Sequence, residues 1–215
     1  ATRHHGAKLL IDATHAVGVL DMDVARLDPD FLLFPTDKWL LGPYGRAFLY
    51  IAERHHNSVP LEQTMSGRKR VRAEDPVYFT DLDYVPDARR FDMGERDFFI
   101  SLDMARHGME LVHSFGRESV EERLAGLTRQ LADRLKVSGL SVTTLPENLR
   151  APNILSLGFP EGMPERLAEA LASRNVYTAP RLGRLRVAPH IYNDEVDCAR
   201  FVEALGEAMA ETSKA

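Results

Sequence analysis

The sequence predicts an α/β fold with a mainly parallel sheet, followed by a smaller α+β domain. Two continuous apolar runs, Lys8 to Ile11 and Phe31 to Phe34, are typical of strands that are buried on both faces. Apolar residues then recur at every third or fourth position from Phe98 to Phe115 and again from Ser119 to Leu135, which is the period of an amphipathic helix. This change of period divides the chain into two regions of different architecture.

The first region, residues 1–94, holds the expected sheet. A short helical or turn segment from Asp21 to Leu27 lies between the two apolar runs, and this spacing predicts parallel neighbouring strands. A third run, from Ala47 to Ala52, follows the turn GPYG at residues 42–45 and can pair back onto the second run as a hairpin. The polar stretch from Asn57 to Asp92 predicts a long loop or a crossing between domains.

The second region, residues 95–215, is expected to form a separate small α+β domain. Ser119 and Glu122 are spaced as a capping box, which predicts that the second helix begins at Ser119. The other elements expected in this domain are strands at Gly139–Thr144, Ile154–Leu157, Asn175–Thr178 and Leu185–Ala188, and helices at Pro164–Ser173 and Asp194–Ala210.

Composition excludes several classes of function. The formal net charge of −5 and the pI near 5.9 leave no overall basic surface that would hold a nucleic acid. No apolar run approaches the roughly 18 to 20 residues that a membrane helix needs, so no membrane partner is expected. The single cysteine excludes an internal disulfide and a cysteine-rich zinc site, and no metal is expected. These observations favour a cytoplasmic protein whose partner is a small molecule or another protein.

Asp12 and Lys38 are the residues whose chemistry stands out. Asp12 lies at the carboxyl end of one predicted strand and Lys38 shortly follows the end of the next, so both can face a ligand at one edge of the sheet. A lysine amine can attack an aldehyde, and an opposing carboxylate can keep a pyridine nitrogen protonated. Spacing alone leaves open the alternative that Asp12 caps a helix and Lys38 is a surface residue in a turn.

Residues 9–52 carry a pattern that resembles a known family. Asp12 is followed three residues later by His15, and Lys38 is followed closely by the Gly-Pro-x-Gly turn at residues 42–45. With the later stretches ARRFDMGERD and LRVAPHIYNDEVD, this pattern resembles the class V aminotransferases, which are fold-type I pyridoxal-phosphate enzymes and include cysteine desulfurases, isopenicillin N epimerase and kynureninase. The resemblance implies the second half of a large cofactor-binding domain, followed by the small domain.

The resemblance also assigns roles to the matching residues. It implies pyridoxal 5'-phosphate as the cofactor, with Lys38 holding it as a Schiff base and shuttling protons, and with Asp12 facing the pyridinium nitrogen. His15 would lie near the ring oxygen or the ring face. Arg186 would hold the α-carboxylate of an amino acid substrate, because a planar guanidinium can donate two parallel hydrogen bonds to a carboxylate.

Some positions depart from the family pattern at the expected phosphate site. Many relatives have a hydroxyl three residues before the lysine and a histidine immediately before it, whereas this chain has Pro35 and Asp37. Thr36 is therefore the expected substitute donor to the phosphate. Desulfurases often have Gly-Thr where this chain has Gly94-Glu95, and an ionised glutamate cannot donate the hydrogen bond that the threonine makes across a dimer. Arg96 is the candidate to supply it instead.

The type of reaction stays open between transamination, elimination and epimerisation, which all begin with removal of the substrate α-proton. Persulfide chemistry is disfavoured, because the segment from Tyr177 to Leu185 contains no cysteine. Cys198 lies beyond Arg186 in a predicted helix, where it is expected to pack against the core. The sequence thus predicts a pyridoxal-phosphate enzyme that acts on an amino acid.

The beginning of the chain suggests that an N-terminal half is absent. A strand of the buried type begins within the first ten residues, as if in the middle of a longer α/β domain. The expected partners are therefore a second copy in a homodimer, or a complementary chain that supplies the N-terminal half. The alternative is a catalytically incomplete subunit that keeps the fold as a scaffold or an interaction partner.

Overall fold

The computed structural model describes residues 2–69, 82–96 and 98–212, and these residues form two compact units. The first unit is Ala1–Phe115 and the second is Gly116–Ala215. The division falls at Gly116 rather than at residues 94 and 95, because the helix Phe99–Ser114 (α2) packs within the first unit. None of the helices in the described part of the chain is both long enough and apolar enough to cross a membrane.

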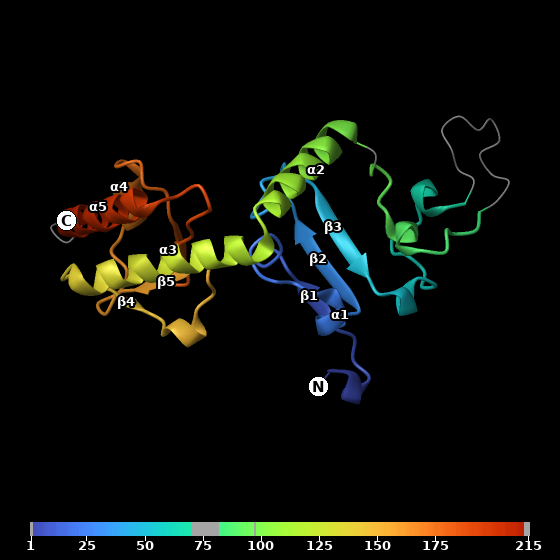
Figure 1. Cartoon of the computed structure of the whole chain (residues 1–215), viewed down its shortest axis with the longest axis horizontal. Coiled ribbons are helices and arrows are strands. Elements are labelled where there is room, and N and C mark those ends of the chain that lie inside the picture. The colour runs from blue at the N-terminus through green and yellow to red at the C-terminus, as the bar shows by residue number, and fades with distance from the viewer. Residues whose placement is uncertain (1, 70–81, 97, 213–215) are drawn as a thin grey trace. The chain divides into compact units, whose positions relative to one another are not determined.

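The first unit is built on a three-stranded sheet with the order β1-β2-β3 (Figure 1). Strand β1 (Leu10–Asp12) pairs in parallel with β2 (Phe31–Pro35), and the short helix α1 (Val24–Leu27) lies in the connection between them. Strand β3 (Ala47–Ile51) pairs with β2 in antiparallel orientation. Both the parallel pair and the hairpin predicted from the sequence are confirmed.

Helix α2 packs closely against the segment that follows β2. A Cβ atom added at Gly108 would lie 2.4 Å from the carbonyl oxygen of Leu40, so only a glycine permits this approach. Ala105 and Val112 on the same helix are buried. The unit also contains short 3-10 helices at Thr2–His5, Glu53–His55, Met65–Gly67 and Ala88–Phe91. Of the long loop expected at residues 57–92, residues 70–81 lie outside the described part of the chain.

Asp30 joins the three strands at the end of the sheet opposite to Asp12. Its carboxylate lies 2.5 Å from His55 Nε2 and accepts hydrogen bonds from Leu9 N at 2.7 Å and Arg54 Nε at 2.8 Å. The bond from His55, and then those from Leu9 and Arg54, hold the pKa of this buried carboxyl well below its usual range. A single anion therefore connects the entries of β1 and β2 with the exit of β3.

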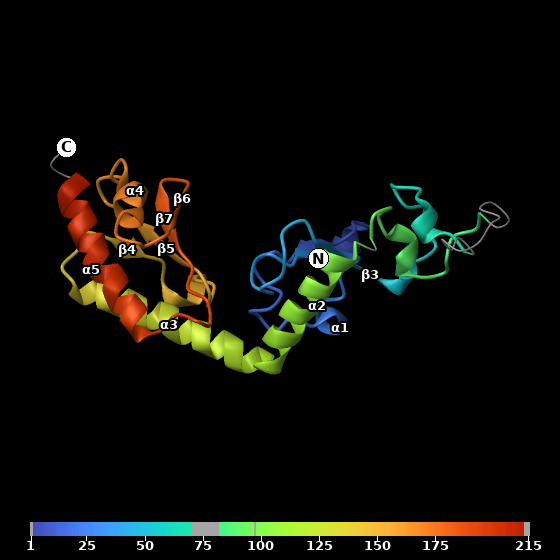
Figure 2. The same cartoon turned by 90° about the horizontal axis from the view of Figure 1, so that it is seen from above.

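The second unit is a four-stranded antiparallel sheet with three helices (Figure 2). The strand order is β4-β5-β7-β6, so β7 is an inner strand. The strands are β4 (Thr143–Thr144), β5 (Leu155–Gly158), β6 (Ala179–Arg181) and β7 (Arg184–Val187), and the helices are α3 (Arg117–Val137), α4 (Leu167–Ala172) and α5 (Glu195–Thr212), with a 3-10 turn at Glu147–Leu149. Leu155, Leu157 and Leu185 are fully buried and form the core face of the sheet.

Three details of the second unit differ from the sequence prediction. Strand β4 is limited to Thr143–Thr144 and does not begin at Gly139. Helix α3 begins at Arg117 after Gly116, which has a φ of +80°, so the capping box expected at Ser119 and Glu122 was wrong. A glycine can adopt this left-handed backbone at little cost and starts the helix two residues earlier. Strand β6 lies at Ala179–Arg181 rather than at Asn175–Thr178, because the ladder pairs Ala179 with Arg186.

Replacing Asp30 by Asn should lower the melting temperature of the first unit by several degrees, because the charge-assisted bonds from His55 and Arg54 are lost. The stabilisation from a carboxyl with a lowered pKa is complete above its unfolded value of about 3.9 and is lost as the pH falls below it. Acid titration followed by circular dichroism should therefore destabilise the natural chain more steeply than the Asp30→Asn variant. Equal acid sensitivity of both proteins would contradict this role for Asp30.

Candidate functional site

The register of the parallel strands places Asp12 and Lys38 at one edge of the first sheet. Asp12 pairs with Leu33, so β1 ends while β2 has only two more residues to run. Because parallel strands end at the same edge, the residues that follow both strands emerge side by side. The sequence-based expectation for this edge therefore has its structural basis in the β1-β2 pairing.

The Asp12 carboxylate is held by the residues directly after it. It accepts hydrogen bonds from Thr14 N at 3.0 Å and from Thr14 Oγ1 at 2.5 Å. These two bonds, with a smaller contribution from the positive charge that His15 can carry, lower the pKa of Asp12 below its usual range. Asp12 is therefore an anion at neutral pH, and its side chain is exposed in this chain.

His15 connects the turn after β1 with the residue next to Lys38. The buried indole of Trp39 donates its Nε1 hydrogen to His15 Nδ1 at 3.1 Å. A neutral His15 must then carry its own proton on Nε2, because Nδ1 acts as the acceptor. Trp39 is buried in the core, and its polar contact with His15 is not visible in the sequence.

Gly18 allows the two segments to approach each other. Its φ is +90°, and a Cβ atom added there would lie 2.9 Å from Leu40 Cδ2 and 3.1 Å from the carbonyl oxygen of Trp39. Any larger residue would be strained by this backbone conformation and would also push the segments apart. The turn after β1 is thus packed directly on the residues that follow Lys38.

The Lys38 amine is paired with its neighbour in the chain. Its Nζ lies 2.7 Å from Asp37 Oδ2 and 5.5 Å from the centre of the Tyr44 ring. The Lys38 side chain is 41% exposed, whereas that of Asp37 is 9% exposed. Asp37 therefore points toward the Lys38 amine.

Thr36 holds the Gly-Pro-x-Gly turn together. Its fully buried hydroxyl lies 3.1 Å from the carbonyl oxygen of Pro43 and 3.2 Å from that of Arg46, so its hydrogen is donated within the turn. A Cβ atom added at Gly42 would lie 2.6 Å from Thr36 Cβ, which explains the first glycine of the motif. This arrangement argues against the phosphate-binding role that the sequence suggested for Thr36.

The segment containing Gly94 and Arg96 is fixed by bonds within the first unit. Arg96 Nη1 lies 2.7 Å from Asp92 Oδ2 and donates to the carbonyl oxygen of Ser66 at 3.1 Å. Ser66 Oγ donates to the carbonyl oxygen of Gly94 at 3.3 Å. Sequence reasoning placed Gly94 and Arg96 near a phosphate, and these bonds hold both residues to the segment around Ser66 and Asp92.

Arg46 is a structural residue that the sequence reasoning missed. It is 9% exposed, and its guanidinium donates to Ser101 Oγ at 2.7 Å and to the carbonyl oxygen of Arg96 at 3.0 Å. These bonds tie the start of β3 to the segment that leads into α2. The available signal was an arginine at the entry of an otherwise apolar strand.

Arg186 lies on the inner strand β7 of the second unit. It is opposite Ser156 on β5 and Ala179 on β6. Its half-buried side chain makes no hydrogen bond or ion pair with any residue in the described part of the chain. The guanidinium is therefore available to an anion from outside this set of residues.

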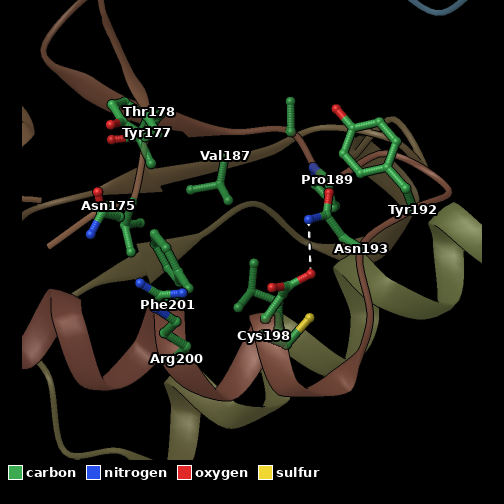
Figure 3. Close-up of a pocket in the computed structure, with 14 residues that line it drawn as sticks. Asn175, Tyr177, Thr178, Val187, Pro189, Tyr192, Asn193, Cys198, Arg200 and Phe201 are labelled. Atoms are coloured by element: carbon green, nitrogen blue, oxygen red, sulfur yellow. Dashed lines mark hydrogen bonds between the residues drawn. The ribbon is translucent and has the colours of Figure 1, made fainter. Parts of the chain in front are cut away.

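A pocket of about 340 Å³ in the second unit contains Cys198 but offers it little reactivity (Figure 3). Asn193 Nδ2 donates to Asp197 Oδ2 at 2.9 Å in the same pocket. Cys198 is 4% exposed on α5, and burial raises the pKa of its thiol. The prediction that this cysteine packs in a helix is confirmed.

Replacing Trp39 by Phe removes the donor to His15 while an aromatic ring stays in the core. We expect the proton of neutral His15 to redistribute from Nε2 toward a mixture of both nitrogens, and stability to fall by about 1 to 2 kcal/mol. Long-range ¹H–¹⁵N NMR spectra report the tautomer, and the exposed His107 serves as an internal control. An unchanged tautomer in the variant would mean that the bond does not orient the ring.

Comparisons with known proteins find relatives along nearly the whole chain. The chain is 25% identical over 208 residues to the uncharacterized aminotransferase YcbU of Bacillus subtilis, covering 95% of this chain and 52% of that protein. It is 27% identical over 236 residues to isopenicillin N epimerase of Amycolatopsis lactamdurans, covering 99% and 54%. The chain therefore spans about half the length of the curated relatives it matches.

A solved structure shares the fold. A variant of C-DES with glycine covalently linked to its pyridoxal-phosphate cofactor matches with a TM-score of 0.76 at 19% identity, covering 94% of this chain and 52% of that one. At this identity the likeness concerns the fold alone. The sequence model of the class-V aminotransferases matches residues 1–191, which is most of the chain. The chain therefore belongs to the aminotransferase class-V family.

Proposed function

We propose that this chain is the part of a pyridoxal-phosphate-dependent enzyme that carries the cofactor lysine, and that the enzyme acts on an amino acid. The observation that carries the proposal is the common edge of β1 and β2, where Asp12 and Lys38 emerge from adjacent parallel strands. The bond between Trp39 and His15 joins these two segments at the same place. The family to which the chain belongs supports the same reading.

The residues at this edge suit the proposed cofactor. Bound there, pyridoxal phosphate supplies an electron-withdrawing ring that stabilises negative charge on the substrate α-carbon. Asp12 is suited to the protonated pyridine nitrogen, because its lowered pKa keeps it anionic at neutral pH. His15 is suited to a ring oxygen, because Nδ1 accepts from Trp39 and the hydrogen of the neutral ring is then on Nε2.

Lys38 would hold the cofactor and then move the proton at the substrate α-carbon. Its amine must leave the ion pair with Asp37 before it can form a covalent bond. Arg186 would hold the substrate α-carboxylate with its guanidinium, which pairs with no residue in the described part of the chain. For the phosphate, the proposed contacts are Gly94 and Arg96, presented from a second copy in a homodimer.

The reaction is proposed to be transamination, elimination or epimerisation, since each requires this proton transfer. The buried thiol of Cys198 supports the view that persulfide chemistry does not use it. A scaffold role is the second candidate. It is favoured by the exposure of Asp12, His15 and Lys38 in this chain.

The first test is the covalent attachment of pyridoxal phosphate to Lys38. The chain mixed with the cofactor should absorb at about 410 to 430 nm, and borohydride should remove this band and fix the cofactor on the peptide that contains Lys38. Lys38→Ala should lose the band, whereas Lys136→Ala, which removes an exposed lysine of α3, should keep it. If the natural chain shows no such band, whether it is alone or mixed with a complementary chain, the scaffold role is favoured.

The second test separates cofactor attachment from catalysis. Asp12→Asn should still bind the cofactor at Lys38, but it should slow deuterium exchange at the α-carbon of L-alanine by about 100-fold or more, because the ring nitrogen loses its anionic partner. Proton NMR measures this exchange. Asp133→Asn, which neutralises an exposed carboxylate on α3, is the matched control. Exchange at the natural rate in Asp12→Asn would remove Asp12 from the mechanism.

A further inference from the structure

Arg186 does not stand alone on its face of the second sheet. Side chains alternate along a strand, so Arg184 and Arg186 of β7 lie on the same face while the buried Leu185 lies on the other. Residues two apart on a strand are separated by roughly 7 Å along its axis. The two guanidinium groups therefore start from neighbouring positions on one half-buried surface.

Arg184 is held in a fixed orientation on this surface. Its Nε donates to Ser156 Oγ at 2.8 Å and its Nη2 to the carbonyl oxygen of Ser156 at 2.9 Å. Ser156 is also the residue directly opposite Arg186. One residue of β5 thus positions the first arginine beside the second.

A glycine makes room for the Arg184 guanidinium. A Cβ atom added at Gly158 would lie 2.5 Å from Arg184 Nη1 and 3.0 Å from its Cζ. Arg184 Nη1 has no acceptor among the residues that the structure describes, and neither arginine pairs with an acid there. Two guanidinium groups without a carboxylate partner on one partly buried face favour a ligand with more than one negative charge.

We propose that Arg184 is a specificity-determining residue that binds a second acidic group of the substrate, so that the enzyme acts on a dicarboxylic amino acid. The inference rests on the proposed function through the role of Arg186, which takes the α-carboxylate. Arg184 takes the side-chain carboxylate with the donors that Ser156 leaves unused. Its fixed orientation reduces the entropy lost when the substrate binds.

The test compares two five-carbon acids that differ in one carboxylate, glutarate and valerate, by calorimetric titration of the full chain. We expect glutarate to bind at least about tenfold more tightly than valerate, as one additional charge-assisted interaction allows. Arg184→Gln should bring the ratio of the two affinities close to one and leave valerate binding unchanged. Arg186→Gln should weaken the binding of both acids.

Two controls test whether a change in the affinity ratio comes from the Arg184 site itself. The alternatives are the loss of any positive charge and a folding defect. Arg166→Gln removes the same charge from an exposed position before α4, where the guanidinium pairs with Glu169 at 2.8 Å, and should keep the ratio. Gly158→Ala keeps every charge but displaces the Arg184 guanidinium, and should lower the ratio. An unchanged ratio in Arg184→Gln, an equal loss in Arg166→Gln, or binding of neither acid by the natural chain would overturn the inference.

The result is independent of the cofactor test. A chain with the Lys38-dependent absorbance but without the Arg184-dependent ratio would overturn the dicarboxylic inference alone. A chain with the ratio but without the absorbance would support the arginine pair and count against the proposed cofactor role of Lys38.

Discussion

The parallel pairing of β1 with β2 is the constraint on which the proposed chemistry depends. Three residue pairs, from Leu10 opposite Phe31 to Asp12 opposite Leu33, set where each strand ends. A shift by one residue would turn Asp12 toward the other face of the sheet, because side chains alternate along a strand. Asp30 secures the opposite end through Leu9 and the residues after β3. The position of Asp12 at one end of the sheet thus depends on the Asp30 carboxylate at the other end.

The charges at the proposed site are satisfied by neighbours in the chain. Asp12 accepts hydrogen bonds from Thr14, and Lys38 is paired with Asp37. The two arrangements have different consequences for a cofactor. The bonds from Thr14 keep Asp12 anionic and are compatible with a ring cation, whereas the ion pair of Lys38 must open before the amine can react. Asp37 would therefore compete with the proposed cofactor for the lysine.

The sequence predicted the elements but not the contacts between side chains. Apolar runs located β1, β2 and β3, and the helical period located α2, because burial patterns are visible in the chain. The hydrogen bonds of Thr36 were not predicted, since its partners, the carbonyl groups of residues 43 and 46, are set by closure of the turn. The start of α3 depended on the positive φ of Gly116, which a spacing rule for capping boxes does not contain.

The roles of the arginines, too, can be read from their contacts but not from the sequence alone. Resemblance singled out Arg186, whereas Arg184 and Arg46 match no motif and became visible only through their partners. Arg46 donates hydrogen bonds to Ser101 and to a backbone carbonyl, so it is a structural residue. Arg184 has two donors on Ser156 and retains Nη1 for a ligand. Whether an arginine stabilises a fold or recognises an anion thus depends on how many of its donors the fold leaves unused, and that number is set by residues distant in the chain.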